Sequence, residues 1–214
     1  MKSEFSVKRV EKKDCTPILL QYHYLKDLSR GFKSGYNYGL YKRDTLVGVI
    51  IFTNLPVPEL VKGMLGGKRT EQRGLFELSR LCLLPDIQST EHNAASYFVS
   101  KAIRQFRKDA DVKLILSYAD SAYHKGTVYQ ASNFTYYGLT DPKKDFWIKQ
   151  PDGSYKKHSR GKVKGLEGEW RPRSQKHRYV MCFDGSLEIK WEKQSVRKMP
   201  TEVLPKTSMH VAAA

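Results

Sequence analysis

Acid and imidazole side chains follow an apolar segment in the middle of the chain. Asp120 comes just after the apolar residues 112–118, and His124 lies four positions further on. Because open α/β sheets place reactive groups at the carboxyl ends of their strands, Asp120 could orient or deprotonate an amine, and His124 could shuttle a proton near neutral pH. The structural alternatives are a helix N-cap for Asp120 and a backbone-bonded loop histidine for His124.

Two further polar residues occur in aromatic or apolar surroundings. His23 lies between two tyrosines and is a proton carrier, a metal ligand or an aromatic packing residue. Arg80 follows Glu77 in a segment that should be half buried, so its guanidinium needs a carboxylate or phosphate partner. An ion pair with Glu77 or Asp120 and a role in binding a donor substrate are both open.

A metal site is a minor alternative. His23, Asp120 and His124 could converge as two histidines and one carboxylate, a ligand set that suits non-haem iron. The spacing of these residues carries no metal-binding signature, so the main expectation is a site without metal.

The apolar periodicity predicts the elements that would position these side chains. Alternating strands and helices of this kind predict an α/β (α+β) fold, a mixed central sheet with parallel neighbours at its centre and helices at its sides. The predicted elements are a short helix starting near residues 14–20, a hairpin over 38–52, a loop over 53–74, strands over 75–83, 112–118, 134–138 and 178–183, an amphipathic helix over 89–107 and a short helix over 126–133.

Charge is concentrated in one part of the chain. The formal net charge is +16, and residues 142–178 contain twelve Lys or Arg against four Asp or Glu, a net +8. Aromatic residues are interleaved with these cations, which is typical of surfaces that follow phosphates and stack on bases; a solvated charged loop is the alternative. The candidate nucleic-acid-binding residues are Lys156, Lys157, Arg160, Lys162, Trp170, Arg171, Arg173, Lys176 and Arg178.

The length of 214 residues predicts one domain, over 1–197, followed by a disordered tail over 198–214. No apolar run approaches the roughly 20 residues that span a bilayer, and the N-terminus has no apolar signal segment. We therefore expect a soluble, cytoplasmic protein without a membrane partner. The oligomeric state stays open, a dimer included.

Residues 126–138 resemble the late helix and strand of GNAT acyltransferases, and residues 75–106 are similar to the donor-binding part of that fold. The resemblance implies two central strands that splay apart around a donor. It places Asn93 and Ser96 at the helix N-terminus that faces the donor, lets Ser79 and Ser117 supply hydroxyls to it, and puts Tyr129 where it could protonate a leaving group, with core packing as the alternative. Residues 88–93 contain no glycine, unlike the usual pyrophosphate loop, which argues against routine acetyl-CoA binding.

A narrower resemblance, from about residue 20 to 183, is to the Mom family of phage DNA-modification proteins. It rests on Tyr22-His23-Tyr24, residues 77–81, residues 117–120, His124 with Gly126, and residues 129–138. The resemblance implies an enzyme that converts adenine in double-stranded DNA to N6-carbamoylmethyladenine and so protects phage DNA from host restriction. The implied donor is an acyl-CoA, an amino-acid derivative or an aminoacyl-tRNA. A tRNA- or protein-directed N-acyltransferase and a non-catalytic DNA-binding protein are the alternatives.

Overall fold

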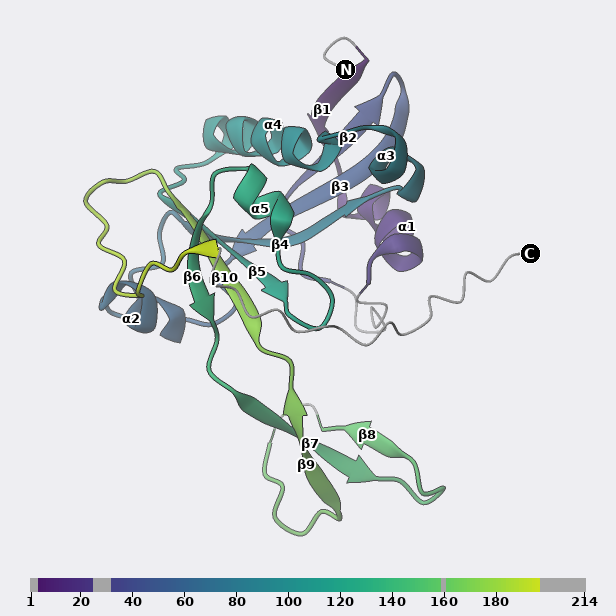
Figure 1. Ribbon diagram of the computed structural model, residues 1–214, viewed down its shortest axis with the longest axis vertical. Helices are drawn as coiled ribbons and strands as arrows, with labels where there is room; N and C mark the ends of the chain where they lie inside the picture. The colour runs from purple at the N-terminus through teal and green to yellow at the C-terminus, as the bar shows by residue number, and fades with distance from the viewer. Residues whose placement is uncertain (1–3, 25–31, 159–160, 197–214) are drawn as a thin grey trace.

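The computed structural model describes residues 4–24, 32–158 and 161–196 (Figure 1). The strands are β1 (Phe5–Arg9), β2 (Tyr36–Lys42), β3 (Thr45–Asn54), β4 (Leu75–Leu83), β5 (Leu114–Asp120), β6 (Thr135–Leu139), β7 (Lys143–Lys149), β8 (Tyr155–Lys157), β9 (Gly168–Arg173) and β10 (Lys176–Cys182). The helices are α1 (Lys12–Tyr22), α2 (Glu59–Leu65), α3 (Pro85–Thr90), α4 (Ala94–Asp109) and α5 (Thr127–Ala131). The predicted tail over 198–214 lies outside the described residues.

Seven strands form the central sheet, in the order β1-β2-β3-β4-β5-β10-β6. The central strands β4 and β5 run parallel, and the other neighbouring strands of this sheet run antiparallel. The parallel pair follows from the long connection through α3 and α4, because a parallel neighbour requires a crossover. The predicted mixed sheet with parallel neighbours at its centre is confirmed.

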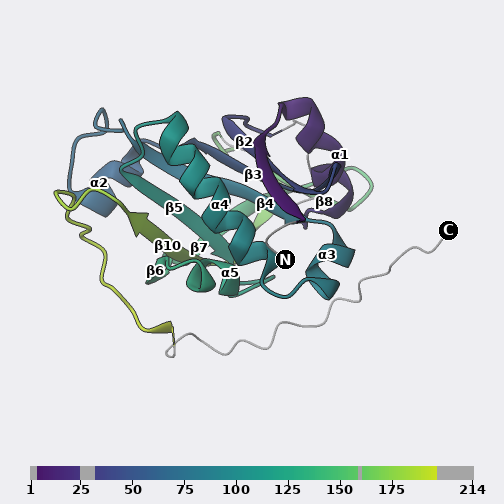
Figure 2. The same cartoon turned by 90° about the horizontal axis from the view of Figure 1, so that it is seen from above.

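Helices cover both faces of this sheet (Figures 1 and 2). The apolar side of α4 packs on one face, where Phe106 is fully buried and its ring lies 4.5 Å from that of Phe52. On the other face, Leu19 of α1 packs with Ile51, and Val61 of α2 packs with the residues around Leu116. This second face is the one that carries the candidate site.

The parallel pair separates part of the way along its length. Ladder pairing between β4 and β5 runs from Leu75 with Leu114 to Leu78 with Ser117 and then stops. Beyond that point β4 continues beside β3, with an irregularity around Ser79, and β5 continues beside β10. The facing edges of β4 and β5 therefore leave backbone groups available at the carboxyl ends of both strands, as the splayed sheet predicts.

The basic segment is an insertion between β6 and β10 that forms a sheet of its own. Its strand order is β8-β7-β9, with both neighbours antiparallel, and it projects from the end of the central sheet (Figure 1). Two residues connect β9 to β10, so the insertion begins and ends close to the start of β10.

Three expectations about elements need correction. Residues 53–74 are not only loop, because they contain α2; the predicted helix over 89–107 is broken, since α3 ends at Thr90 and α4 begins at Ala94. The N-terminal helix begins at Lys12, where Glu11 is the N-cap and Asp14 completes a capping box. No helix among the described residues is long and apolar enough to cross a bilayer.

Candidate functional site

Acidic and basic side chains meet where β4 and β5 separate. Glu77 of β4 is in register with Leu116 of β5, and Lys176 of β10 is in register with Asp120. Since successive side chains of a strand alternate between faces and Asp120 lies four residues after Leu116, Glu77, Asp120 and Lys176 share one face of the sheet. This face is the one covered by α1 and α2.

Asp120 ends β5 and also begins the turn that follows. The Ala122 N–H donates to Asp120 Oδ1 at 3.1 Å, and the N–H groups of Tyr123 and His124 donate to the Asp120 carbonyl at 2.9 and 3.0 Å. The N-cap-like alternative for Asp120 is thus realised by one oxygen of a carboxylate that is only 8% exposed. The second oxygen, Oδ2, has no hydrogen-bond donor among the residues that the structure describes and is free to accept a proton or a hydrogen bond from a ligand.

Glu77 is a half-buried carboxylate in a strongly basic environment. Burial raises its pKa, while the charges of Arg80, Lys176 and Lys33 oppose that rise. Burial raises the pKa of Tyr118, and the charge of Glu77 raises it further. The net rise for Glu77 despite three cations shows that loss of hydration dominates at this position.

Arg80 lies beside Ile51 of β3 and is half buried. Its Nη1 donates to the Ser79 carbonyl at 2.6 Å, and its Nε is buried without a hydrogen-bond partner among the described residues. Among the ion pairs formed within 4–24, 32–158 and 161–196, none joins Arg80 to Glu77 or Asp120. The guanidinium therefore keeps donor capacity for an anionic or carbonyl oxygen.

Four aromatic rings surround the turn after Asp120. His23 is buried and stacks on Tyr24, with centroids 4.6 Å apart, and Tyr24 contacts Tyr123 at 4.8 Å and the edge of His124 at 5.7 Å. Burial lowers the pKa of His124, and the charge of Asp120 opposes that shift. His124 is consequently neutral at pH 7 and able to accept a proton.

Tyr129 joins this region from the opposite face. It is 5% exposed in the core beneath α5, and its hydroxyl shares a hydrogen bond with Ser117. Burial raises its pKa to about 12, so the phenol stays protonated at neutral pH. Tyr129 thus satisfies the core-packing alternative while its hydroxyl lies at Ser117, where β4 and β5 part.

The residues predicted to hold a donor are already engaged with the backbone. Ser79 Oγ donates to the Ile51 carbonyl at 3.2 Å, Ser117 Oγ to the Leu78 carbonyl at 3.1 Å, and Ser96 Oγ to the Asn93 carbonyl at 3.1 Å. Asn93 is the N-cap of α4, with a φ of 62°. Each of these hydroxyls can still accept a hydrogen bond from a ligand, but its proton is already donated to a backbone carbonyl.

The predicted nucleic-acid-binding residues divide between the two sheets. Lys176 and Arg178 belong to β10 of the central sheet, and the Arg178 guanidinium lies 4.6 Å from the centroid of Trp191. The remaining described residues of the prediction belong to the insertion, while Arg160 lies outside the described ranges. Trp170 is 54% exposed, which fits a stacking surface.

Several cations of the insertion are paired within it. Lys157 and Arg173 approach Asp145 at 2.6 and 4.0 Å, Lys149 approaches Glu167 at 2.8 Å, and Arg171 pairs with Glu169. The Arg171 guanidinium also lies over the rings of Trp147 and Tyr155, at 4.9 and 4.5 Å. Exposed cations of the insertion without an ion pair to a described residue are Lys143, Lys144, Lys156, Lys162 and Lys164.

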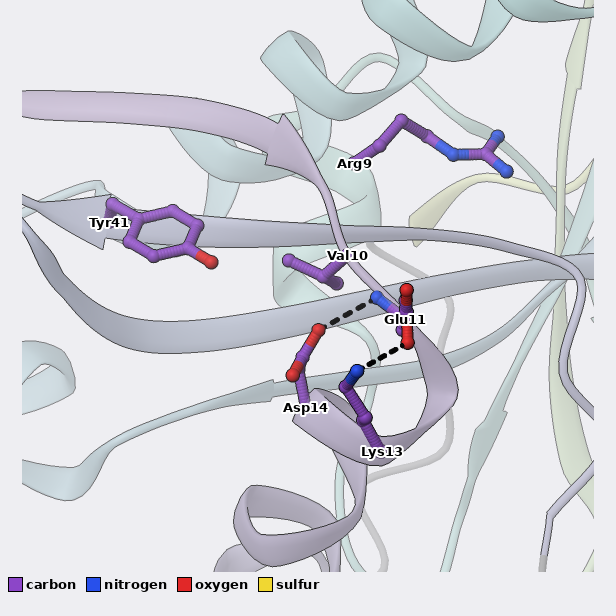
Figure 3. Close-up of a pocket in the computed structure, with 6 residues that line it drawn as sticks. All are labelled: Arg9, Val10, Glu11, Lys13, Asp14 and Tyr41. Carbon is purple, nitrogen blue, oxygen red and sulfur yellow. Dashed lines mark hydrogen bonds and ion pairs between the residues drawn. The ribbon is translucent and has the colours of Figure 1, made fainter.

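The described residues give no support to the iron alternative. They contain no group of three or more His, Cys, Asp or Glu side chains arranged to hold a metal, and this includes His23, Asp120 and His124. A surface depression does occur at the start of α1, where Lys13 pairs with Glu11 at 2.8 Å and Asp14 accepts from the Glu11 N–H (Figure 3). It lies at the opposite end of α1 from His23 and holds none of the predicted site residues.

Sequence reasoning did not assign four parts of this site: Glu77, Tyr24, Tyr123 and the position of Lys176. The occurrence of an acid inside an otherwise apolar strand was the sequence signal that could have marked Glu77 as a site residue. Lys176 was assigned to the basic segment because its neighbours along the chain are basic, whereas its partner across the sheet is Asp120.

Similarity to known proteins agrees with this architecture. The model of the Mom protein family matches residues 4–206. No curated protein sequence matches the chain. A Bacillus subtilis acetyltransferase solved in complex with CoA is similar in structure, with 14% identity and a TM-score of 0.50, covering 84% of this chain and 99% of that one. An IAA acetyltransferase from Bacillus cereus is similar at 10% identity and a TM-score of 0.50, with the same coverage of 84% and 99%. These likenesses show a GNAT-like fold.

Proposed function

We propose that this chain, which belongs to the Mom protein family, transfers a small acyl-type group to the N6 amine of adenine in double-stranded DNA. The observation that carries the proposal is the placement of Asp120, Glu77 and Arg80 around the point where β4 and β5 separate, at the end of the sheet from which the basic insertion leaves. The resemblance to the family implies N6-carbamoylmethyladenine as the product, made in phage DNA in the host cytoplasm as protection from restriction.

The splay between β4 and β5 is the proposed donor site. Its unpaired strand edges can hydrogen-bond an extended chain, and the N-terminus of α4 carries backbone N–H groups that favour an anionic group. The Bacillus subtilis structure with the similar fold holds CoA. This supports an acyl-CoA as the first donor to test, and the absence of glycine from residues 88–93 keeps an amino-acid derivative or aminoacyl-tRNA as the next.

Asp120 is the proposed base for the adenine amine. The amine lies in the base-pairing edge of a duplex, so the target base must leave the stack to reach a buried carboxylate. In the transfer the N6 nitrogen forms a bond to the donor carbonyl carbon, the bond from that carbon to the sulfur or oxygen of the donor breaks, and the proton from N6 passes through Asp120 to the departing thiolate or alkoxide. The Nε of Arg80, which has no hydrogen-bond partner among the described residues, can stabilise the charge that develops on the carbonyl oxygen.

With a glycyl donor, this transfer step gives N6-glycyladenine, which has the composition of N6-carbamoylmethyladenine but carries a carbonyl carbon on N6. The carbamoylmethyl product requires N6 to bond to the α-carbon of the glycine unit instead, with the carbonyl carbon bonded to the glycine nitrogen. A glycyl amide on N6 and a carbamoylmethyl group on N6 are isomers, so the intact mass of the nucleoside does not distinguish them. Fragmentation of the modified base does, because only the carbamoylmethyl isomer keeps a carbon bonded to N6 that is not a carbonyl carbon.

The test compares DNA from cells that express the wild type, Asp120→Asn and Asp141→Asn. Asparagine keeps the Oδ1 acceptor for the Ala122 N–H and removes only the charge, so the turn should survive. We expect nucleoside mass spectrometry to find modified adenine in wild-type DNA, roughly 10²–10⁴-fold less with Asp120→Asn, and no change with Asp141→Asn, which is exposed.

Two results would contradict the proposal. Unmodified adenine in wild-type DNA together with modified tRNA or protein would support the alternative N-acyltransferase. Full modification by Asp120→Asn would remove Asp120 from its role as the base.

A further inference from the structure

Three aromatic rings near Asp120 lie in series from the interior to the surface: His23 stacks on Tyr24, and Tyr24 contacts Tyr123 at a tilt. Exposure rises from 5% at His23 to 37% at Tyr24 and 57% at Tyr123, and the centroids are 4.6 and 4.8 Å apart. Within the described part of the chain, Tyr123 is the exposed end of this series of rings. Tyr123 is more than half exposed, and its N–H donates to the carbonyl of Asp120, whose side chain is buried.

The position of Tyr123 is fixed by the turn that it shares with Asp120. Its N–H donates to the Asp120 carbonyl at 2.9 Å, and the preceding Ala122 N–H donates to Asp120 Oδ1 at 3.1 Å. The Ser121 N–H donates to the carbonyl of Gln175 at 3.0 Å, in the link between β9 and β10. The backbone of Tyr123, the Asp120 carboxylate and the base of the insertion are therefore joined through the hydrogen bonds of this turn.

We propose that the exposed ring of Tyr123 stacks on the adenine that has left the duplex and so presents its N6 amine to Asp120. This inference rests on the proposed function and adds a base-binding residue to it. A base that leaves the DNA duplex loses the stacking interaction with its neighbouring bases. An aromatic side chain can replace part of this stacking, whatever the DNA sequence. The DNA backbone would be held by the insertion, to which the Tyr123 turn is bonded.

Tyr22 offers a matched control on the same side of the molecule. It is 39% exposed at the end of α1, and it contacts no other aromatic ring of the described residues. Replacing it by alanine removes an exposed tyrosine near the site without touching the series of rings.

The experiment uses the full chain and a short single-stranded oligonucleotide that contains 2-aminopurine, a fluorescent isomer of adenine. Anisotropy of an end label measures binding, and 2-aminopurine fluorescence measures stacking of the base. We expect binding to weaken roughly tenfold to a hundredfold in Tyr123→Ala, with loss of the fluorescence change, and to be kept in Tyr123→Phe and Tyr22→Ala. With duplex DNA as substrate, Tyr123→Ala should raise KM for DNA more than it lowers kcat.

The outcomes separate this inference from the proposed function. If Tyr123→Ala binds the oligonucleotide as the wild type does while adenine in DNA is still modified, only the stacking role of Tyr123 fails. If Tyr123→Ala weakens binding of CoA and leaves oligonucleotide binding unchanged, the ring belongs to the donor site and the inference is overturned. If the wild type neither binds nor modifies DNA, the proposed function itself fails.

Discussion

Glu77, near the start of β4, and Asp120, at the end of β5, are acids on the same face of the sheet, and their surroundings differ. Asp120 has one oxygen fixed by the turn that follows, whereas Glu77 faces a cluster of cations and loses hydration through burial. A half-buried carboxylate whose pKa is raised destabilises the folded state at neutral pH, because the charged form prefers water. Such a residue at the predicted donor site is expected to be kept for function at a cost in stability.

At the residue scale, Glu77→Gln should make the protein more stable at neutral pH. The pKa of Glu77 is raised in the folded state, so the folded protein binds this proton more tightly than the unfolded chain does. The stability of the wild type therefore falls as the pH rises from the pKa of Glu77 in the unfolded chain through its pKa in the folded protein. The gain of Glu77→Gln should therefore be seen near pH 7 and disappear at about pH 4, where the ordinary glutamate is largely protonated. Thermal unfolding of both proteins across this range measures the effect.

Glu192→Gln is the control for this change, because it makes the same substitution at an exposed position. A stability loss in Glu77→Gln at neutral pH would mean that the surrounding cations outweigh burial. Loss of DNA modification together with higher stability would show that Glu77 serves the reaction.

The candidate site was only partly accessible to sequence reasoning. Asp120 and His124 could be named because a strand end predicts where reactive groups stand, and the structure does place them in one turn. Lys176 could not be placed beside Asp120, because the register of β10 against β5 depends on the insertion that separates them along the chain. The contact of the Tyr24 ring with the Tyr123 ring likewise joins residues about a hundred positions apart.

At the scale of elements, periodicity predicted those with a clear apolar face. The strand over residues 75–83 has the predicted bounds, and α4 has the predicted buried face. The helix α2 was missed because its seven residues lie among prolines and glycines that usually indicate a loop. The strands of the insertion were missed since their lysines and aromatic residues do not give an apolar face, so only the charge of this segment was predicted.

The start of α5 depends on Gly126, and Gly126→Ala should destabilise the fold. Its φ is +73°, and an added Cβ would lie 2.5 Å from Tyr179 Cε2 and 3.0 Å from Tyr129 Cδ2. Backbone strain of about 1–2 kcal/mol and overpacking of about 1–3 kcal/mol should add at this position. Chemical denaturation measures the loss in the free energy of unfolding.

Gly153→Ala is a matched control for that loss. Gly153 has a φ of +80° but no atom within 4 Å of an added Cβ, so only the backbone strain of about 1–2 kcal/mol applies. Equal losses in the two variants would contradict close packing of Gly126 against Tyr179 and Tyr129.

At the scale of the whole molecule, the chain joins a GNAT-like sheet to a basic sheet that is inserted near its reactive end. Half of the net charge lies between residues 142 and 178, yet the insertion pairs part of its own charge through Asp145, Glu167 and Glu169. The unpaired lysines are therefore the ones able to release counterions from DNA. Two of these lysines, Lys156 and Lys162, are exposed and lie within the insertion, far from Asp120 in the sequence.

Lys156→Gln combined with Lys162→Gln should weaken DNA binding to a similar degree for all sequences. Each phosphate contact that is lost should reduce the slope of log affinity against log salt concentration by about 0.9. Titration of duplex DNA at several salt concentrations measures this slope, and Lys108→Gln is the control, because Lys108 is exposed on α4, which packs on the other face of the central sheet. If the control reduces the slope as much as the double variant does, phosphates are bound by the general positive charge of the molecule and the insertion has no special part in it.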